Sequence, residues 1–235
     1  VFSLMAGALV LWAVWHLLVP MRMLLVADLF AYMRMLAEGR GADWEAYRDR
    51  ITALGKRITG QESDDTLVVG HSLGGIAAIF AVADLLERWP AGRPLGLLTL
   101  GSVHGIVLAQ RGAGQGALAD AIARICADPR VFWVDVSSPR DAFSVALTDP
   151  LLLIGDRAVP GMTSPRVISA PLARAPRIPG DRRTLFGAMR LHMGYLLPAP
   201  EGAGFDYADT VTGAETLAAR FGPRRNSPKA RMWQP

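Results

Sequence analysis

A five-residue segment in the first half of the chain has the residue types and spacing that nucleophilic catalysis by a serine requires. In Gly70-His71-Ser72-Leu73-Gly74, two glycines flank Ser72 at a distance of two residues on each side. A serine hydroxyl is a weak nucleophile at neutral pH, so it needs free access, a neighbouring base and N–H groups that stabilise an oxyanion. The flanking glycines leave room for the backbone to fold back tightly. The segment therefore predicts Ser72 as a nucleophile and the N–H of Leu73 as one oxyanion donor.

The context of this segment favours catalysis over a purely structural glycine turn. Thr66-Leu67-Val68-Val69, directly before it, is a short apolar run that predicts a strand buried on both faces. Residues 74–89, directly after it, have the pattern of a helix that stops before Pro90. A serine on a sharp turn from strand to helix is the arrangement of a nucleophile elbow.

The string Gly70-His71-Ser72-Leu73-Gly74-Gly75 resembles the elbow of lipases and esterases in the α/β-hydrolase superfamily. Leu100-Gly101-Ser102-Val103-His104-Gly105 is similar to the Gly-Ser/Thr-Pro-His-Gly loop of many lipases, with Val103 in place of proline. The likeness covers residues 66 to about 221, and outside the elbow it rests on the order of elements. It implies a serine hydrolase that cleaves carboxylic esters through an acyl-enzyme.

The resemblance also implies the order nucleophile, acid and base along the chain. Of the four histidines, His16 lies in an apolar segment, His71 lies inside the elbow and His104 precedes the strand expected to carry the acid. His192 remains as the predicted base. The alternative interpretation is a histidine of the core or of a helix surface, because Met189-Arg190-Leu191-His192-Met193 has a helical pattern.

The acid of such a triad is expected in the loop after the strand Val131–Val136, where a buried carboxylate can hold the imidazole tautomer. Asp141 lies in this loop and is the predicted acid. Asp135, within the strand, is the second candidate, and Asp149 begins an Asp-Pro turn. The predicted catalytic residues are therefore Ser72, Asp141 and His192.

The elements around these residues predict an α/β fold with a mostly parallel sheet and flanking helices, similar to an α/β-hydrolase. Further strands are expected at Leu95–Leu100 and Val131–Val136, with a helix over residues 118–126 between them. One short strand is expected around Val167, inside an irregular stretch from residue 156 to 183. Two helices should close the fold, one near residues 184–197 and one that begins at a capping box, Thr212-Gly213-Ala214-Glu215.

An amphipathic helix is expected before the first strand. Asp43 is the predicted N-cap, and apolar residues recur behind it at steps of three and four. The stripe predicted to be buried consists of Trp44, Tyr47, Ile51, Leu54 and Ile58.

The N-terminal 40 residues are expected to form a separate apolar segment. Residues 1–19 contain no charged side chain, and 19 residues at about 1.5 Å each roughly match the hydrocarbon thickness of a bilayer. This predicts a membrane anchor, and the alternatives are a buried helix and a signal peptide. Arg22, Arg34 and Arg40 follow the apolar run, so the positive-inside rule places the catalytic domain in the cytoplasm.

The remaining domain boundaries follow from composition. Residues 41–222 are predicted to form the α/β-hydrolase-like domain. Residues 223–235 form a basic tail with four cationic side chains and no acid. A tail of this kind is expected to be solvated and disordered, although it could touch anionic lipid headgroups.

Composition excludes several classes of protein. The net charge of +4 arises from 25 basic and 21 acidic residues spread along the chain, unlike the dense basic stripe of a nucleic-acid-binding protein. The single cysteine, Cys126, cannot form an intramolecular disulfide. The elbow lacks the lysine of a phosphate-binding loop, and no His/Cys/carboxylate cluster has metal-ligand spacing. We therefore expect no cofactor, no metal and no nucleic-acid partner. The resemblance to lipases and esterases implies a small-molecule or lipid-like ester as substrate.

One departure from the superfamily pattern keeps other functions open. Its sheet has strands before the elbow, and one of them leads into the loop that gives the second oxyanion donor. No strand is predicted within residues 1–60, so the chain is either an N-terminally incomplete form or has helices in their place. The competing hypotheses are a catalytically silent, membrane-associated protein of this fold and an acyltransferase, in which an acceptor alcohol or thiol replaces water.

Overall fold

A four-stranded parallel sheet is the centre of the protein. A computed structural model describes residues 7, 12–13, 27–60, 63–172, 185–199 and 202–234. Within them the strand order follows the chain, β1-β2-β3-β4, and every neighbouring pair is parallel. The strands are β1 (Thr66–His71), β2 (Leu95–Leu100), β3 (Val131–Ser137) and β4 (Arg166–Ser169). The predicted α/β class with a parallel sheet is confirmed.

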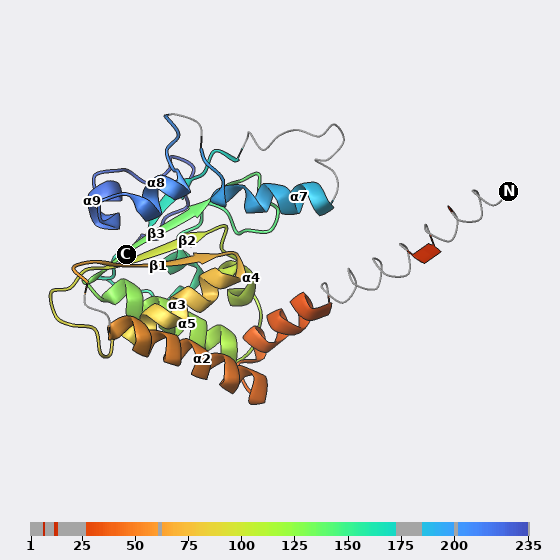
Figure 1. The fold of residues 1–235 in the computed structure, drawn as a ribbon. Helices are drawn as coiled ribbons and strands as arrows, with labels where there is room; N and C mark the ends of the chain where they lie inside the picture. Colours follow the sequence, from red (N-terminus) through yellow and green to blue (C-terminus); the bar gives the residue numbers. More distant parts are fainter. Residues whose placement is uncertain are drawn as a thin grey trace.

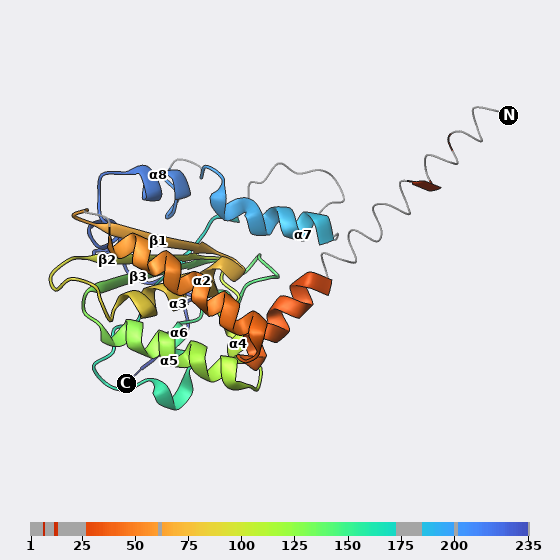
Figure 2. The same cartoon turned by 60° about the horizontal axis from the view of Figure 1, so that its bottom comes forward.

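Helices cover both faces of this sheet, as Figures 1 and 2 show from two directions. One face carries α2 (Ala42–Thr59), α3 (Leu73–Leu85) and α5 (Ala113–Ala127). The opposite face carries α7 (Leu185–His192), α8 (Tyr207–Thr212) and α9 (Leu217–Phe221). The short elements between them are α4 (His104–Leu108), α6 (Pro150–Leu153), η1 (Gly155–Arg157) and η4 (Met193–Leu196).

The strands supply apolar side chains to two separate cores, one on each face. In β2, Leu95 and Leu97 belong to the cluster under α2, α3 and α5, whereas Leu98 and Leu100 belong to the opposite cluster. This alternation is the two-residue period of a strand. Every residue of β2 is buried, which explains why the strand is a continuous apolar run rather than an alternating one.

Helix α2 packs against α3 with the predicted stripe, except at one position. Ile51 is buried, but Leu54 is 50% exposed. Gly55 takes the inward position in its place, and a Cβ atom at Gly55 would lie 3.6 Å from Leu85 Cδ2. The two helices approach closely at this glycine, so the face that packs is turned slightly away from Leu54.

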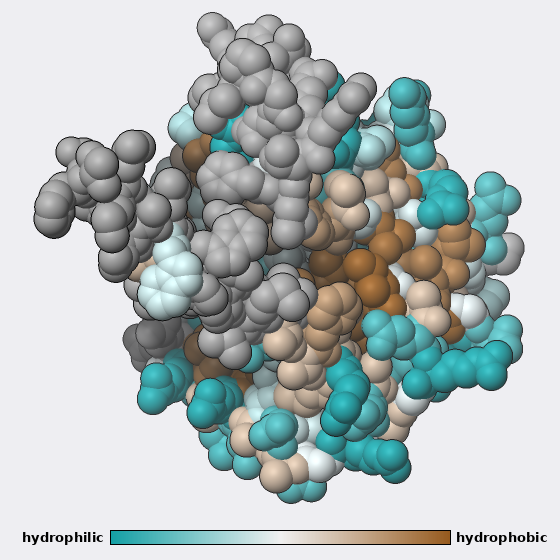
Figure 3. Space-filling view, turned by 90° about the vertical axis from the view of Figure 1, so that its right-hand side faces the viewer, coloured by the Kyte–Doolittle hydropathy of each residue, from teal (hydrophilic) through white to brown (hydrophobic). Residues whose placement is uncertain are grey.

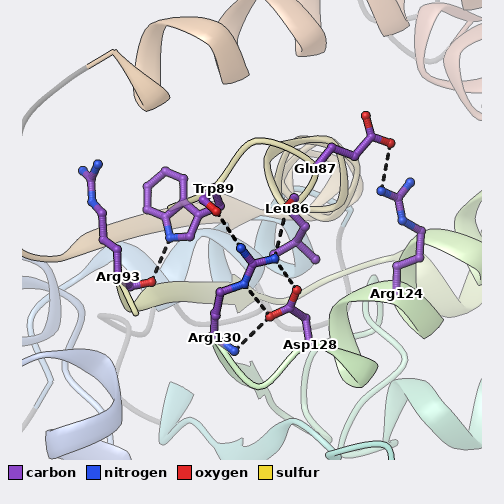
Figure 4. Close-up of polar contacts among 7 residues, drawn as sticks. All are labelled: Leu86, Glu87, Trp89, Arg93, Arg124, Asp128 and Arg130. Atoms are coloured by element: carbon purple, nitrogen blue, oxygen red, sulfur yellow. Dashed lines mark hydrogen bonds and ion pairs between the residues drawn. The ribbon is translucent and has the colours of Figure 1, made fainter. Parts of the chain in front are cut away.

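A partly buried network around Arg130 holds the end of α3 against the start of β3 (Figure 4). The guanidinium donates to the carbonyl oxygens of Leu86 at 3.0 Å and Trp89 at 2.6 Å, which follow the last turn of α3. It also donates from two nitrogens to the Asp128 carboxylate, at 2.9 and 2.6 Å. Arg130 thus gives acceptors at a helix end the donors that the helix itself lacks.

Two of the predicted helix starts are wrong. The N-cap of α2 is Gly41 rather than Asp43, which lies inside the first turn, where its charge favours the helix dipole. The last helix begins at Leu217 rather than after Thr212, which ends α8. Thr216 caps this helix by accepting a hydrogen bond from the Ala219 N–H. The capping-box pattern favoured the Thr212 hydroxyl as the cap, whereas the structure has the Thr216 hydroxyl in this role.

The C-terminal residues are docked on the sheet, so the expectation of a solvated, disordered tail is wrong. Asn226 and Ser227 bond to the edge of β4, where the side-chain oxygen of Asn226 accepts from the Val167 N–H at 2.9 Å. Farther along, the N–H of Trp233 donates to the buried carboxylate of Asp149 at 3.1 Å. The bonds to β4 satisfy backbone groups that an open sheet edge would leave unpaired.

The predicted membrane anchor lies mainly outside the described residues. Of residues 1–19, only Gly7, Trp12 and Ala13 are described. No helix in the described part of the chain is both long enough and apolar enough to cross a membrane. The anchor over residues 1–19 therefore stays a prediction.

Residues 27–38 are helical, and the end of this helix packs on the body of the protein. Leu36 is 1% exposed and belongs to the core cluster that includes α3 and α5 residues. Its carbonyl oxygen lies directly against Gly114 in the first turn of α5, so that a Cβ atom at Gly114 would overlap this oxygen. The close approach of two backbones requires a glycine here.

We expect Gly114→Ala to lower the free energy of unfolding by about 1–3 kcal/mol, the usual cost of overpacking. The added methyl group must push the 27–38 helix away from α5, so hydrogen exchange at residues 32–37 should also accelerate. Urea unfolding and hydrogen-exchange mass spectrometry measure the two effects.

Gly116→Ala is the matched control on the same helix. The closest atom to a Cβ at Gly116 is a terminal nitrogen of Arg157 at 3.5 Å, which is ordinary contact. This variant should be neutral or slightly more stable, because alanine favours helix. Equal stability of the two variants would contradict the packing argument.

Candidate active site

The turn that carries Ser72 has the strained geometry of a nucleophile elbow. Ser72 lies between the end of β1 and the start of α3 with φ 57° and ψ −125°, and Leu147 is the other described non-glycine residue with positive φ. Such a conformation costs about 1–3 kcal/mol and persists where the surroundings impose it. The Ser72 N–H donates to the Leu100 carbonyl at 2.9 Å, and the Gly75 N–H donates to the Ser72 carbonyl at 3.0 Å. These two bonds tie the turn to the end of β2 and to the first turn of α3.

Gly70 is required by the tight return of the chain. A Cβ atom there would overlap the Gly74 carbonyl and lie 2.6 Å from the Gly75 Cα. At Gly74 itself, a Cβ atom would meet nothing within 4 Å. The first glycine of the motif is therefore a packing requirement, whereas Gly74 leaves open space beside the serine.

Asp141 and His192 form a buried hydrogen-bonded pair. His192 Nδ1 lies 2.8 Å from Asp141 Oδ2, and both side chains are almost fully buried. The other carboxylate oxygen, Oδ1, accepts from the Phe143 N–H at 2.9 Å. Burial acts to raise the pKa of Asp141, but the donors from His192, the Phe143 amide and Tyr195 outweigh it and hold that pKa below its usual value. Asp141 is thus a buried carboxylate that stays charged.

His71 connects this pair to the elbow. Its Nε2 atom lies 3.0 Å from the His192 carbonyl oxygen, so its Nε2–H donates to that oxygen. The two imidazole rings are 4.7 Å apart, centroid to centroid. Burial lowers the pKa of His71, which keeps this ring neutral at neutral pH. Because Ser72 is the next residue, this contact holds the elbow near the predicted base, although the Ser72 hydroxyl makes no hydrogen bond to His192 Nε2.

The remaining nitrogen of His192 is free to take a proton. Its Nε2 atom is buried and has no hydrogen-bond partner among the described residues. With Asp141 at Nδ1, the tautomer that donates from Nδ1 is favoured, and Nε2 then carries the lone pair. Catalytic hydrogen bonds often tighten only when substrate binds, so the open nitrogen is compatible with the prediction of His192 as a base.

Leu73 is the first residue of α3, a helix of 13 residues. The first N–H groups of a helix have no acceptor within the helix, and the helix dipole adds partial positive charge there. The N–H of Leu73 is therefore suited to stabilise negative charge beside Ser72, and its role as an oxyanion donor stays a prediction.

The two other aspartate candidates have different partners. Asp135 is buried between strands and accepts a 2.6 Å hydrogen bond from Thr99 Oγ1, which in turn accepts from the Trp133 indole at 2.9 Å. Burial raises the pKa of Asp135 to about 7. Asp149 caps α6 by accepting from the Leu151 N–H at 2.9 Å. Of the three, the structure joins only Asp141 to His192.

The other histidines also fall outside the pair. His104 is 1% exposed, its Nδ1 lies 2.6 Å from Ser102 Oγ, and burial lowers its pKa to about 4. It is a neutral core residue at the start of α4. His16 lies outside the described residues.

Two neighbours of the pair were not identified from the sequence. Tyr195 donates from its hydroxyl to Asp141 Oδ2 at 3.0 Å, and His71 contacts His192 as described above. The spacing of Tyr195, three residues after His192, could have indicated that both lie on one helical face. The contact of His71 had no such local signal, because 121 residues separate it from His192.

The described residues contain no group of three or more His, Cys, Asp or Glu side chains that could hold a metal ion. The expectation of a site without a metal stays a prediction.

The raised pKa of Asp135 makes stability depend on pH. In the folded protein the Asp135 carboxyl keeps its proton up to about pH 7. In an unfolded chain it loses the proton near 3.8, the ordinary pKa of an aspartate. The contribution of Asp135 to the free energy of unfolding is therefore fully present below about pH 4 and is lost as the pH rises toward 7. Asp135→Asn cannot ionise, so its stability relative to the wild type should increase between pH 5 and pH 8, by on the order of 2–3 kcal/mol.

Urea unfolding of both proteins at the two pH values measures this difference. Asp64→Asn, at an exposed position, is the control and should show the same difference at both pH values. A constant difference for Asp135→Asn as well would mean that Asp135 is ionised throughout this range.

No protein-family model matches the chain, and the searches of curated proteins and of solved structures found no match either. The case for a function therefore rests on the strained turn at Ser72 and on the Asp141–His192 pair.

Proposed function

We propose that this chain is a serine hydrolase of the α/β-hydrolase type, which cleaves carboxylic esters through Ser72, Asp141 and His192. The observation that carries the proposal is the state of His192. Its Nδ1 bonds to Asp141, and its buried Nε2 has no hydrogen-bond partner among the described residues. Buried polar atoms in a core usually have partners. The buried Nε2 of His104 also lacks one, but His192 differs because a carboxylate bonds to its Nδ1 and its ring lies beside that of His71 in the elbow. A base that receives its proton from Ser72 during the reaction explains the open nitrogen of His192.

The proposed reaction uses these groups in two steps. Ser72 Oγ attacks the ester carbonyl carbon while its proton passes to His192 Nε2, and the Leu73 N–H stabilises the oxyanion. Asp141 stabilises the imidazolium, which then protonates the leaving alcohol. Water attacks the acyl-enzyme, gives a proton to His192, and releases the carboxylic acid as Ser72 recovers its hydrogen.

The order of the elements supports an α/β-hydrolase-like arrangement. The serine follows the first parallel strand, the aspartate follows the third and the histidine follows the fourth. Ser72 and Asp141 therefore come from the edge of the sheet at which the strands end, the usual place for ligands in an open parallel sheet. His192 contacts His71 and Asp141 at this edge.

An apolar ester is the proposed substrate class. Met189 and Met193, on either side of His192, are 43% and 45% exposed, and Ile106 of α4 is 39% exposed. Figure 3 looks from the side where α4 lies and shows apolar residues gathered on part of this face, bordered by hydrophilic ones. Exposed apolar area of this kind favours lipid-like or acyl esters over highly charged substrates. Attachment to a membrane through residues 1–19, with the catalytic domain in the cytoplasm, is part of the same proposal.

A silent scaffold of the same fold is the alternative, and one observation favours it. Strand β1 lies at the edge of the sheet, because the described residues 27–60 before it are helical or coil. The loop that would give a second oxyanion donor is therefore not identified. Chemical labelling of Ser72 separates the two hypotheses.

We expect a fluorophosphonate probe to label the full chain in detergent, and Ser72→Ala to abolish the labelling. The probe reports an activated serine without any assumption about the substrate, and mass spectrometry of the labelled peptide should locate it at Ser72. Ser63→Ala, at an exposed serine outside the site, should label like the wild type. A folded wild type that does not react would favour the silent scaffold.

Asp141→Asn should lower the turnover of p-nitrophenyl esters by roughly 10³–10⁴-fold, because the amide favours the wrong tautomer of His192. Asp135→Asn, which replaces the carboxyl bonded to Thr99, should keep most of the activity. Short and medium acyl chains can be compared in the same assay, with cooperative unfolding as the test of folding. A larger loss from Asp135→Asn than from Asp141→Asn would assign the acid to the strand instead of the loop.

A further inference from the structure

The carboxylate oxygen that holds His192 also accepts a second hydrogen bond. Asp141 Oδ2 lies 2.8 Å from His192 Nδ1 and 3.0 Å from the Tyr195 hydroxyl oxygen. The Phe143 N–H donates to the other oxygen at 2.9 Å. Three donors thus surround one buried carboxylate, and two of them share a single oxygen atom.

Tyr195 is held rigidly in this position. It lies in η4, one helical turn after His192, and is 1% exposed. Its ring packs against Gly101 at the end of β2, so closely that a Cβ atom at Gly101 would lie 2.5 Å from Cε2. The ring is also perpendicular to that of His192, at an angle of 88° and a centroid distance of 6.2 Å. A side chain packed in this way keeps its hydroxyl in place before any substrate arrives.

The hydroxyl can act only as a donor to the carboxylate. Burial and the negative charge of Asp141 raise the pKa of Tyr195, so the phenol keeps its proton. A hydrogen bond to an ionised carboxylate favours the charged form and disperses its charge. The donor also restricts rotation of the carboxylate, which fixes the direction from which His192 is held.

We propose that Tyr195 is a positioning residue of the active site, which holds the Asp141 carboxylate in the charged state and orientation that align His192. This inference rests on the proposed hydrolase function for its catalytic consequence, but the geometry that carries it is independent of substrate. Among the described residues, the titratable groups that face His192 are His71 from the end of β1, Asp141 from the loop after β3 and Tyr195 from η4.

Tyr195→Phe tests the proposal, because it removes the hydroxyl and keeps the ring. The titration midpoint of the Asp141 carboxyl carbon, followed by NMR in the full chain, should move upward by roughly half a pH unit or more, since one of three donors is lost. If the wild type hydrolyses esters, kcat should fall several-fold while KM stays the same, because Tyr195 does not take part in substrate binding.

Tyr207→Phe is the matched control. Tyr207 packs against the same apolar cluster as Tyr195 but begins α8 and makes no described bond to Asp141. Its loss of a hydroxyl should leave the Asp141 midpoint unchanged. An unchanged midpoint in Tyr195→Phe, with cooperative unfolding retained, would overturn the proposal.

The wild type provides a second test if Tyr195→Phe does not fold. The Tyr195 hydroxyl proton should exchange slowly with water and show a nuclear Overhauser effect to the ring protons of His192. A rapidly exchanging hydroxyl without this effect would overturn the proposal.

The outcomes also separate this inference from the proposed function. A shifted Asp141 midpoint in a chain that neither hydrolyses esters nor reacts with fluorophosphonate would support the positioning role and reject the hydrolase. An active wild type with no shift in Tyr195→Phe would support the hydrolase and reject the positioning role.

Discussion

The parallel register of the four strands is the constraint on which the candidate site depends. His71 pairs with Leu100, Leu100 pairs with Val136, and Val136 pairs with Ile168, so these residues form one row across the sheet. Each strand therefore releases its following loop at the same edge. Ser72 follows the row directly and Asp141 lies in the loop after β3. His192, the last residue of α7, contacts both His71 of the row and Asp141. If β1 and β3 ran in opposite directions, Ser72 and Asp141 would lie at opposite edges of the sheet.

Two aspartates, one in β3 and one in the following loop, show how local donors decide the state of a buried carboxyl. Asp135 has a hydroxyl donor from Thr99, and burial raises its pKa. Asp141 has an imidazole, a backbone amide and a phenol, and its pKa is lowered although burial acts in the opposite direction. Desolvation alone would neutralise both groups. The number of donors makes Asp141 the carboxylate that can stabilise a charged histidine.

The ends of the described chain stabilise the body that carries the site. The 27–38 helix is held where the Leu36 carbonyl meets the backbone of Gly114. Residues 226–233 bond to the edge of β4 and to Asp149, which begins α6. Both contacts join segments far apart in the sequence, and both depend on backbone groups or small side chains. Local patterns carry no signal for contacts of this kind, which is why a basic composition wrongly indicated a disordered tail.

The sequence alone determined the elements whose signal is local. The apolar runs of β1, β2 and β3, the elbow around Ser72 and the helix after it could be predicted because strand burial, glycine spacing and helix periodicity all act within a few residues. The choice of Asp141 and His192 as partners followed from their order in the chain. Tertiary structure decided the rest, namely the edge position of β1, the cap at Thr216, the inward Gly55 in place of Leu54, and the contacts of His71 and Tyr195 with the pair. The reason is physical, because hydrogen bonds and close packing between residues up to 121 positions apart exist only after the sheet and its two helical layers have come together.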